Sequence, residues 1–222
     1  MTSFFTSSVG KKFIMSVTGI FLILFLIVHL TVNSLLLVGA DAFNEAAHFM
    51  ATNPVIVIIE PLLAVGFIVH IIYSAYITLQ NQRQRPVRYR KVERWSSSTW
   101  PSRNMFILGA FILIYLVIHL SNFFWKVRFG QVETVMVNGT EMHNLYSLVS
   151  SLFQNWWYDL IYILGALFLA LHLSHGFWAA FQSLGWNNDL WRNRLKRIAY
   201  VFALIMGVGF SIIPIYFLII NN

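Results

Sequence analysis

The stretch Ala170-Leu171-His172-Leu173-Ser174-His175-Gly176-Phe177-Trp178 decides how this sequence is interpreted. It lies inside a long apolar run and places His172 where a membrane-spanning helix favours leucine. Three other apolar runs contain His29, His70 and His119 in the same way. An ionisable side chain at membrane depth is costly, by about 3 kcal/mol or more, and therefore indicates a functional site. Four such histidines, one in each of four runs, require a shared explanation.

The composition indicates an integral membrane protein. The chain has 222 residues, of which 58% are hydrophobic, 17% aromatic and only 10% charged, unlike a soluble domain. Five apolar stretches are long enough to cross a hydrocarbon core of about 30 Å as helices: 13–38, 55–79, 104–126, 157–181 and 197–220. Open strands cannot satisfy their backbone in lipid, so we expect an all-α fold with five transmembrane helices in a single domain over 1–222, the first four forming a bundle that carries the four histidines.

The distribution of charge predicts the topology. The chain carries a net charge of +7, and its basic residues gather in the N-terminal flank, the second loop and the fourth loop. The positive-inside rule places these segments in the cytoplasm and the C-terminus outside. The charge therefore indicates orientation rather than binding of nucleic acid. The basic residues of these three segments are Lys11 and Lys12; Arg83, Arg85, Arg88, Arg90, Lys91, Arg94 and Arg103; and Arg192, Arg194, Lys196 and Arg197.

The N-terminal apolar run is about twice as long as the core of a signal peptide, so we expect it to remain in the mature protein. No Arg-rich and Ser-rich amphipathic presequence precedes it. This favours a bacterial protein of the cytoplasmic membrane.

The histidines form two pairs by depth. His29 lies 17 residues after Lys12 and His119 lies 16 after Arg103, in helices predicted to run outward. His70 and His172 each lie ten residues before the glutamine that ends an inward-running helix. At a rise of about 1.5 Å per residue, the outer pair His29/His119 and the inner pair His70/His172 are about 10 Å apart in depth. Two stacked haems with bis-histidine ligation fit this spacing.

The absence of cysteine narrows the choice of redox centre. It excludes disulfides, thiolate-bound iron–sulfur clusters and the attachment motif of c-type haem. Divalent-metal sites usually recruit carboxylates or thiolates as well as histidines, and the spans contain almost none. Two alternatives stay open at this point. A single membrane histidine often forms a hydrogen bond between helices, and a row of histidines would also suit a proton path or transporter.

Small residues flank two of the histidines. Gly66 precedes His70 by one turn, and Gly176 follows His172 by one turn. Glycine removes side-chain bulk where a planar cofactor or another helix approaches. Both residues are therefore candidates for cofactor binding, and close helix packing is the alternative.

Four further features have two interpretations each. Thr18 lies three turns before His29, on the same stripe of the helix, and its hydroxyl could reach a haem edge or bond to its own helix. His175 is a rival ligand or a partner for a haem propionate. Glu60, the one carboxylate clearly embedded in a span, is a helix-end residue or part of a quinone site. Asn138-Gly139-Thr140 matches a glycosylation acceptor, and an ordinary turn is favoured.

Two groups of motifs point to a known family. One is Ser8-Val9-Gly10-Lys11-Lys12-Phe13, continuing to Ser16-Val17-Thr18-Gly19 and His29-Leu30. The other is His172-x-x-x-Gly176-x-Trp178, continuing to Leu184-Gly185-Trp186 and the basic run 192–196. Together they resemble the cytochrome b subunit of succinate dehydrogenases and fumarate reductases, of the single-chain, five-helix, di-haem type. The resemblance covers essentially the whole chain.

The resemblance implies a ligand set. Each of the first four helices supplies one axial histidine, so that His29 pairs with His119 and His70 pairs with His172. Ser16 matches a family position near the propionates of the inner haem. The fourth ligand is the histidine four residues before the glycine.

By that motif, His172 and not His175 is the fourth ligand. Some fumarate reductases of this type have a glutamate two residues before it, which is credited with proton movement. This position is Ala170 here, so we do not expect that pathway.

The resemblance also implies a function. The chain would anchor a flavoprotein subunit and an iron–sulfur subunit at the cytoplasmic side, where succinate and fumarate are interconverted. Electrons would pass through the two haems b to a quinone, such as menaquinone, near the outer surface, and two such complexes could form a dimer. The alternative within this class is a di-haem cytochrome b of another quinone-linked dehydrogenase.

Overall fold

Five long helices form the molecule, and the computed structural model describes residue 4 and residues 7–83, 99–186 and 188–220 of it. All five are long and apolar enough to cross a membrane, which confirms the predicted all-α integral membrane fold. They are α1 (Ser8–Ser34), extended by the short η2 (Leu35–Leu37); α3 (Pro54–Arg83); α6 (Met105–Asn122), continued by α7 (Phe124–Phe129); α9 (Trp156–Ser183); and α10 (Asp189–Ile220).

The last helix begins earlier than the sequence predicted. The expected start was residue 197, whereas α10 starts at Asp189 and includes the basic residues assigned to the fourth loop. Asn188 is the N-cap of this helix, because its side-chain oxygen accepts the backbone N–H of Trp191 at 2.8 Å. Such a cap can start a helix outside the membrane. Arg85, Arg88, Arg90, Lys91 and Arg94 of the second loop lie outside the described residues.

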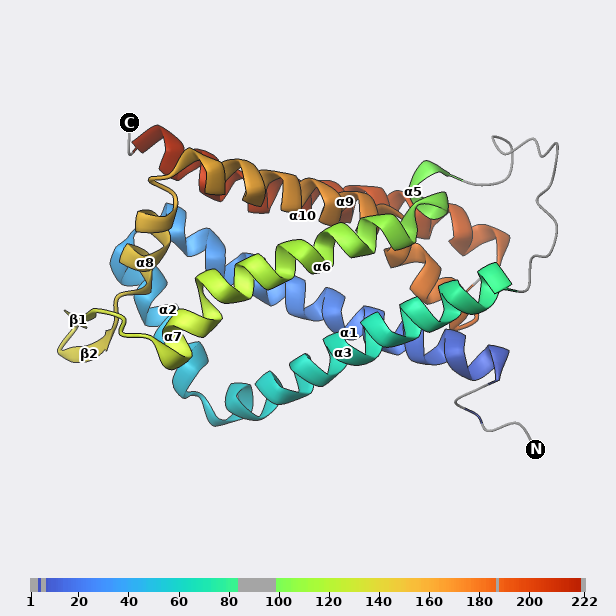
Figure 1. Ribbon diagram of the computed structural model, residues 1–222, viewed down its shortest axis with the longest axis horizontal. Coiled ribbons are helices and arrows are strands. Elements are labelled where there is room, and N and C mark those ends of the chain that lie inside the picture. The colour runs from blue at the N-terminus through green and yellow to red at the C-terminus, as the bar shows by residue number, and fades with distance from the viewer. Residues whose placement is uncertain (1–3, 5–6, 84–98, 187, 221–222) are drawn as a thin grey trace.

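The helices alternate in direction and so give the bundle two distinct ends (Figure 1). We call the end where α1, α6 and α10 begin the N-terminal end, and the opposite end, which carries the small hairpin β1–β2, the hairpin end. Helices α9 and α10 pack along their full length, and α9 also contacts α1 and α6. Helix α3 packs mainly on α1 and has few contacts with α6.

Short elements cover the hairpin end (Figure 1). They are α2 (Ala40–Thr52), α8 (Leu145–Leu152) and the strands β1 (Thr134–Val137) and β2 (Thr140–His143), which pair in antiparallel register with Val137 opposite Thr140. Between the strands, Asn138 and Gly139 have φ of 49° and 81°, as a type I′ hairpin turn requires. Asn138-Gly139 thus forms a turn, as the sequence predicted. At the other end, the short α5 (Trp100–Arg103) precedes α6.

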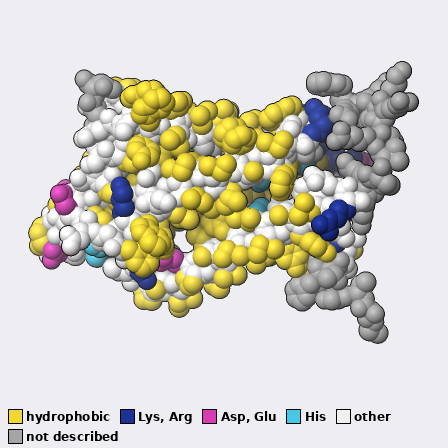
Figure 2. Space-filling model, in the orientation of Figure 1, with side chains coloured by type: hydrophobic (Ala, Val, Ile, Leu, Met, Phe, Trp, Pro, Cys, Tyr) yellow, Lys and Arg dark blue, Asp and Glu magenta, His cyan; other side chains and the backbone are white. Residues whose placement is uncertain are grey.

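The side chains divide between a small core and a broad apolar surface. A cluster at the hairpin end includes Leu36, Phe153 and Phe217, and a second cluster joins α1, α9 and α10 around Leu173. Most other large apolar side chains are exposed along the helices (Figure 2). This exposure is what a lipid environment allows, since lipid tails are as apolar as leucine.

Candidate functional site

The four membrane histidines come from four different helices that surround one hollow. His29 is on α1, His70 on α3, His119 on α6 and His172 on α9, and all four side chains are partly buried. Figure 2 shows this face of the molecule hollowed between α3 and α6, with histidine side chains inside the hollow. The few contacts between α3 and α6 agree with that opening.

The structure brings His29 and His119 together toward the hairpin end. Their ring centroids are 5.8 Å apart and their planes are nearly perpendicular, at 86°. At a metal–nitrogen distance of about 2 Å, two imidazoles on opposite sides of one metal have centroids about 6 Å apart. The spacing of this pair is therefore that of two axial ligands of one metal.

Aromatic rings enclose this hairpin-end pair. Phe25, one turn earlier on α1, stacks on His29 with centroids 5.1 Å apart, and Phe210 of α10 lies 5.8 Å from it. The rings around His119 are those of Tyr115, Phe123 and Tyr162, at 5.8, 5.3 and 5.9 Å.

Asn33 contacts His29 through its side chain. Its amide nitrogen donates to the backbone oxygen of His29 at 2.8 Å and lies 3.4 Å from Nδ1 of the same residue. In this geometry Nδ1 of His29 faces a donor. The buried Nδ1 of His119 has no hydrogen-bond partner in the described part of the chain.

The second pair lies toward the N-terminal end and has a different setting. His70 and His172 are near neighbours across the bundle. Thr18 Oγ1 lies 3.3 Å from Nδ1 of His70, and it already donates its own proton to the Ile14 carbonyl at 2.8 Å. Nδ1 of His70 is therefore the donor in this contact, which leaves Nε2 with a free lone pair. This is the arrangement that metal-ligating histidines show.

Glycines line the N-terminal-end pair. A methyl group added to Gly19 would lie 3.7 Å from Cε1 of His70, and one added to Gly109 would lie 3.8 Å from Cε1 of His172. A methyl group added to Gly176 would lie 3.8 Å from Cδ2 of His172. Any larger side chain at these positions would occupy the space beside the two rings.

These residues fit a haem better than a bare metal ion. Among the described residues, no group of three or more His, Asp or Glu side chains could hold a metal, and a divalent site would normally recruit such a group. A pair of histidines with the spacing of His29 and His119 matches instead what an iron porphyrin needs, since a porphyrin ring would supply the other four nitrogens.

The remaining predicted residues are distributed around this centre. Ser16 is buried and donates to the Lys12 carbonyl at 2.9 Å. Gly66 packs against the ring of Phe21, at 2.9 Å for an added methyl group, and so lies at the contact of α1 and α3. The ring of His175 lies edge-on to that of Trp178, with centroids 5.2 Å apart, and its buried Nδ1 has no partner among the described residues. Glu60 is exposed on α3.

The sequence interpretation overlooked a second embedded carboxylate. Asp159, in the first turn of α9, is 2% exposed, and neither of its carboxylate oxygens has a hydrogen-bond partner within the described ranges. Glu60, the carboxylate that the sequence interpretation singled out as clearly embedded, is the exposed one of the two. Gly19, Gly109 and Asn33 were not predicted as site residues either, although Gly19 directly follows Thr18 and Asn33 lies one turn after His29.

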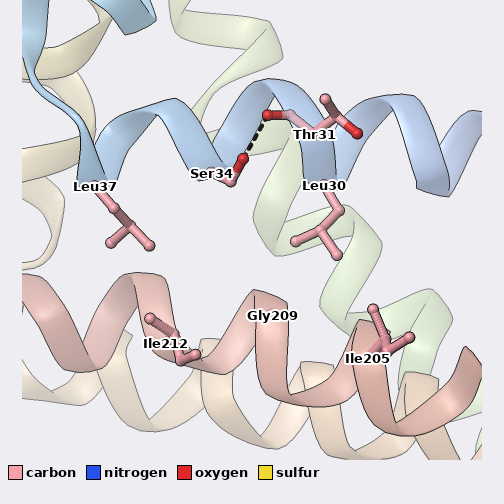
Figure 3. Close-up of a pocket in the computed structure, with 7 residues that line it drawn as sticks. All are labelled: Leu30, Thr31, Ser34, Leu37, Ile205, Gly209 and Ile212. Atoms are coloured by element: carbon pink, nitrogen blue, oxygen red, sulfur yellow. Dashed lines mark hydrogen bonds between the residues drawn. The ribbon is translucent and has the colours of Figure 1, made fainter. Parts of the chain in front are cut away.

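A separate groove lies on the lipid-facing side, between α1 and α10 (Figure 3). It encloses about 310 Å³, and none of the four histidines lines it. The Ser34 hydroxyl donates to the Thr31 carbonyl at 2.7 Å, so the polar groups there bond to their own helix. The lining residues are Leu30, Thr31, Ser34, Leu37, Ile205, Gly209 and Ile212.

Known proteins similar to this chain are cytochrome b subunits. The chain is 29% identical over 189 residues to the succinate dehydrogenase cytochrome b558 subunit of Bacillus subtilis, covering 85% of this chain and 84% of that protein. It is 26% identical over 216 residues to the fumarate reductase cytochrome b subunit of Helicobacter pylori, covering 88% of this chain and 76% of that protein. These relatives confirm the resemblance inferred from the motifs. No protein-family model and no solved structure matches the chain.

Proposed function

We propose that this chain is the cytochrome b membrane anchor of a succinate dehydrogenase or fumarate reductase, and that it binds two haems b. The observation that carries the proposal is the pair His29 and His119, whose ring centroids, from α1 and α6, lie 5.8 Å apart with nearly perpendicular planes. The names of the similar proteins support the same conclusion. His70 and His172 would hold the second haem, with Thr18 orienting His70.

Haem b at each pair would supply a one-electron carrier between the iron–sulfur partner and a membrane quinone. The chain would contribute the ligands, their orientation and an apolar environment. Because both axial positions would be filled by histidine, neither site leaves a position open for oxygen. The five helices around the centre are apolar, which suits the site to electron transfer rather than to substrate chemistry.

The two ends of the bundle would have different partners. We assign the flavoprotein and iron–sulfur subunits to the N-terminal end, where the exposed residues Arg83 and Arg103 lie, and we place this end in the cytoplasm by the positive-inside rule. The quinone would react near the hairpin end. Two electrons crossing the membrane would then couple about 4.6 kcal/mol per 100 mV of membrane potential to the reaction, at about 2.3 kcal/mol per charge.

A reduced-minus-oxidised visible spectrum of the purified chain, with pyridine haemochrome quantitation, tests the proposal. We expect about two haems b per chain, one for each histidine pair, and reduction by succinate when the partner subunits are present. Haem b without reduction by succinate would assign the chain to another quinone-linked dehydrogenase. A chain without haem would contradict the proposal and favour a histidine-containing transporter or proton channel.

Glu60 is the proposed contact to the quinone, because it is a carboxylate exposed on a spanning helix near the hairpin end. Glu60→Gln should slow quinone reduction by the assembled complex and change its pH dependence, while succinate oxidation by an artificial acceptor stays unchanged. Glu133→Gln, in the loop before β1, is the control. Quinone kinetics identical in Glu60→Gln and wild type would remove Glu60 from the site.

A further inference from the structure

Lys11 is a buried cation near the start of α1. Its side chain is only 6% exposed, although it directly precedes Lys12, which is exposed. The ammonium group donates to Oε1 of Gln80 and lies 5.3 Å from the ring centroid of Tyr76. Lys11 therefore crosses from α1 to α3 and is held there by two neutral groups.

This cation has no counter-ion in the described part of the chain. No Asp or Glu side chain lies within ion-pair distance of it there. The described acidic residue at the same end, Asp189, is exposed and pairs with Arg192 at 3.9 Å. A buried charge is costly unless an opposite charge accompanies it. The amide of Gln80 and the face of Tyr76 offset that cost only in part, so the site is one for an anion.

The position of Lys11 points to the source of the anion. Lys11 lies seven residues, or about 10 Å, before Thr18 on the same side of α1, and Thr18 contacts His70. On α3, Tyr76 and Gln80 follow His70 by six and ten residues, or about 9 and 15 Å. The ammonium group thus lies on the α1–α3 seam that holds His70, between that histidine and the N-terminal end.

We propose that Lys11, with Gln80 and Tyr76, binds a propionate carboxylate of the haem held by His70 and His172. The inference rests on the proposed function. A haem has two carboxylates at one edge of its ring, and they are its only anionic groups. With the propionate edge toward the N-terminal end, one carboxylate meets the ammonium group and supplies the counter-ion that the described residues do not. Lys11 is a positioning residue for that haem and does not touch its iron.

A redox titration of the two haems in the purified complex tests this. The variants are Lys11→Gln, the matched control Lys12→Gln, which removes the same charge one residue away, and Lys11→Arg, which keeps the charge. A cation at the propionate favours the reduced haem, which carries one more electron. We expect Lys11→Gln to lower the reduction equilibrium constant of one haem about tenfold, or about 59 mV for one electron. The potential of the other haem in Lys11→Gln should stay near the wild-type value. Both haem potentials in Lys12→Gln and in Lys11→Arg should also stay near wild type.

A second measurement separates contact with the propionate from a general electrostatic effect on the iron. The wild-type and Lys11→Gln chains are reconstituted with the dimethyl ester of haem b, in which both carboxylates are neutral. If Lys11 acts through a propionate, the difference in potential between the two chains should disappear with the ester. A difference that persists would contradict the proposed contact.

The outcomes distinguish this inference from the function on which it rests. Two haems with unchanged potentials in Lys11→Gln would overturn the propionate site and leave the cytochrome assignment intact. Unchanged potentials together with loss of the flavoprotein and iron–sulfur subunits would show that Lys11 pairs with a carboxylate of a partner, which also overturns it. A wild-type chain without haem would instead contradict the proposed function itself.

Discussion

The two histidine pairs occupy the same bundle in contrasting surroundings. The hairpin-end pair, His29 and His119, is enclosed by the rings of phenylalanine and tyrosine. The N-terminal-end pair, His70 and His172, is lined by glycines and has a threonine hydroxyl at one ring nitrogen. One pair is surrounded by aromatic rings, and the other has a hydrogen-bonding hydroxyl and glycines beside its rings.

The hydrogen bonds of the two pairs differ in direction. Thr18 accepts from Nδ1 of His70, so Nε2 of that ring is ready to bind a metal. Asn33 presents its amide nitrogen to Nδ1 of His29, which is the reverse of the usual pattern at ligating histidines. The comparison teaches that two similar histidine pairs can have different surroundings. The second ring of each pair is alike in one respect, since the buried Nδ1 of His119 and that of His172 have no partner among the described residues.

Removing single ligands should have the largest effect. His29→Leu and His119→Leu should each lower the haem content from about two to about one per chain, with loss of the same spectral component. The double variant should lose no more than either single one, because both residues serve one haem. His70→Leu and His172→Leu should remove the other component. Pyridine haemochrome assays and redox titrations measure this.

His143→Leu, in strand β2, and His175→Leu are the controls for ligand removal, and both should retain two haems. Loss of a haem in His175→Leu but not in His172→Leu would reverse the assignment of the fourth ligand. Loss of different components in His29→Leu and His119→Leu would break the pairing.

Filling the space beside His70 should have the next largest effect. Gly19→Leu should weaken binding of the N-terminal-end haem about tenfold or more, because overpacking costs about 1–3 kcal/mol and about 1.4 kcal/mol is tenfold in affinity. Gly19→Ala should be tolerated, since its methyl group would lie 3.7 Å from the ring. Haem transfer to an excess of apomyoglobin measures the loss. Equal loss from both sites would mean that the glycines do not distinguish them.

The hydrogen bonds to the rings should matter unequally. Thr18→Val should reduce haem affinity at the N-terminal-end site about 10-fold, at the low end of the 10- to 100-fold range for such partners. Asn33→Leu should change the hairpin-end site by less, because Asn33 does not accept from the ring. Thr18→Ser keeps the hydroxyl and should behave as wild type. A larger effect of Asn33→Leu would reverse the comparison.

The smallest predicted effect is on stability and concerns the buried carboxylate of Asp159, at the hairpin end. Lys11 has two partners, whereas both carboxylate oxygens of Asp159 have none in the described chain. Asp159→Leu should raise the free energy of unfolding by about 1 kcal/mol, because relief of an unsatisfied buried group gains about 1–3 kcal/mol and loss of an acid near a helix N-terminus costs about 0.3–1 kcal/mol.

Asp189→Leu is the matched control for Asp159→Leu, because Asp189 is an exposed acid in the first turn of α10. It should lower stability slightly, having only the unfavourable contribution. Thermal unfolding in detergent compares the two variants. A decrease in the stability of both variants would mean that the carboxylate of Asp159 has a stabilising partner in the folded protein.

The sequence was sufficient to predict the membrane-spanning helices but not the residues that line the site. Hydropathy and length predict all five helices, and the depth of each histidine suggests the pairing that brings His29 beside His119. The roles of Gly19, Gly109 and Asp159 were not predictable in this way. These helices are apolar on all sides, so periodicity does not reveal which face turns inward, and the burial of Lys11 against α3 depends on that choice.

The hydrogen bonds between Asn44 and the segment 144–146 have a consequence for biogenesis. Asn44, buried in α2, donates to the side chain of Asn144 at 3.3 Å and accepts the backbone N–H of Tyr146 at 2.9 Å. These partners are synthesised about a hundred residues later. Until then the first connection cannot reach its final structure, so a ribosome-bound intermediate with two or three inserted helices should be recognisable to membrane proteases, and the finished chain should resist them.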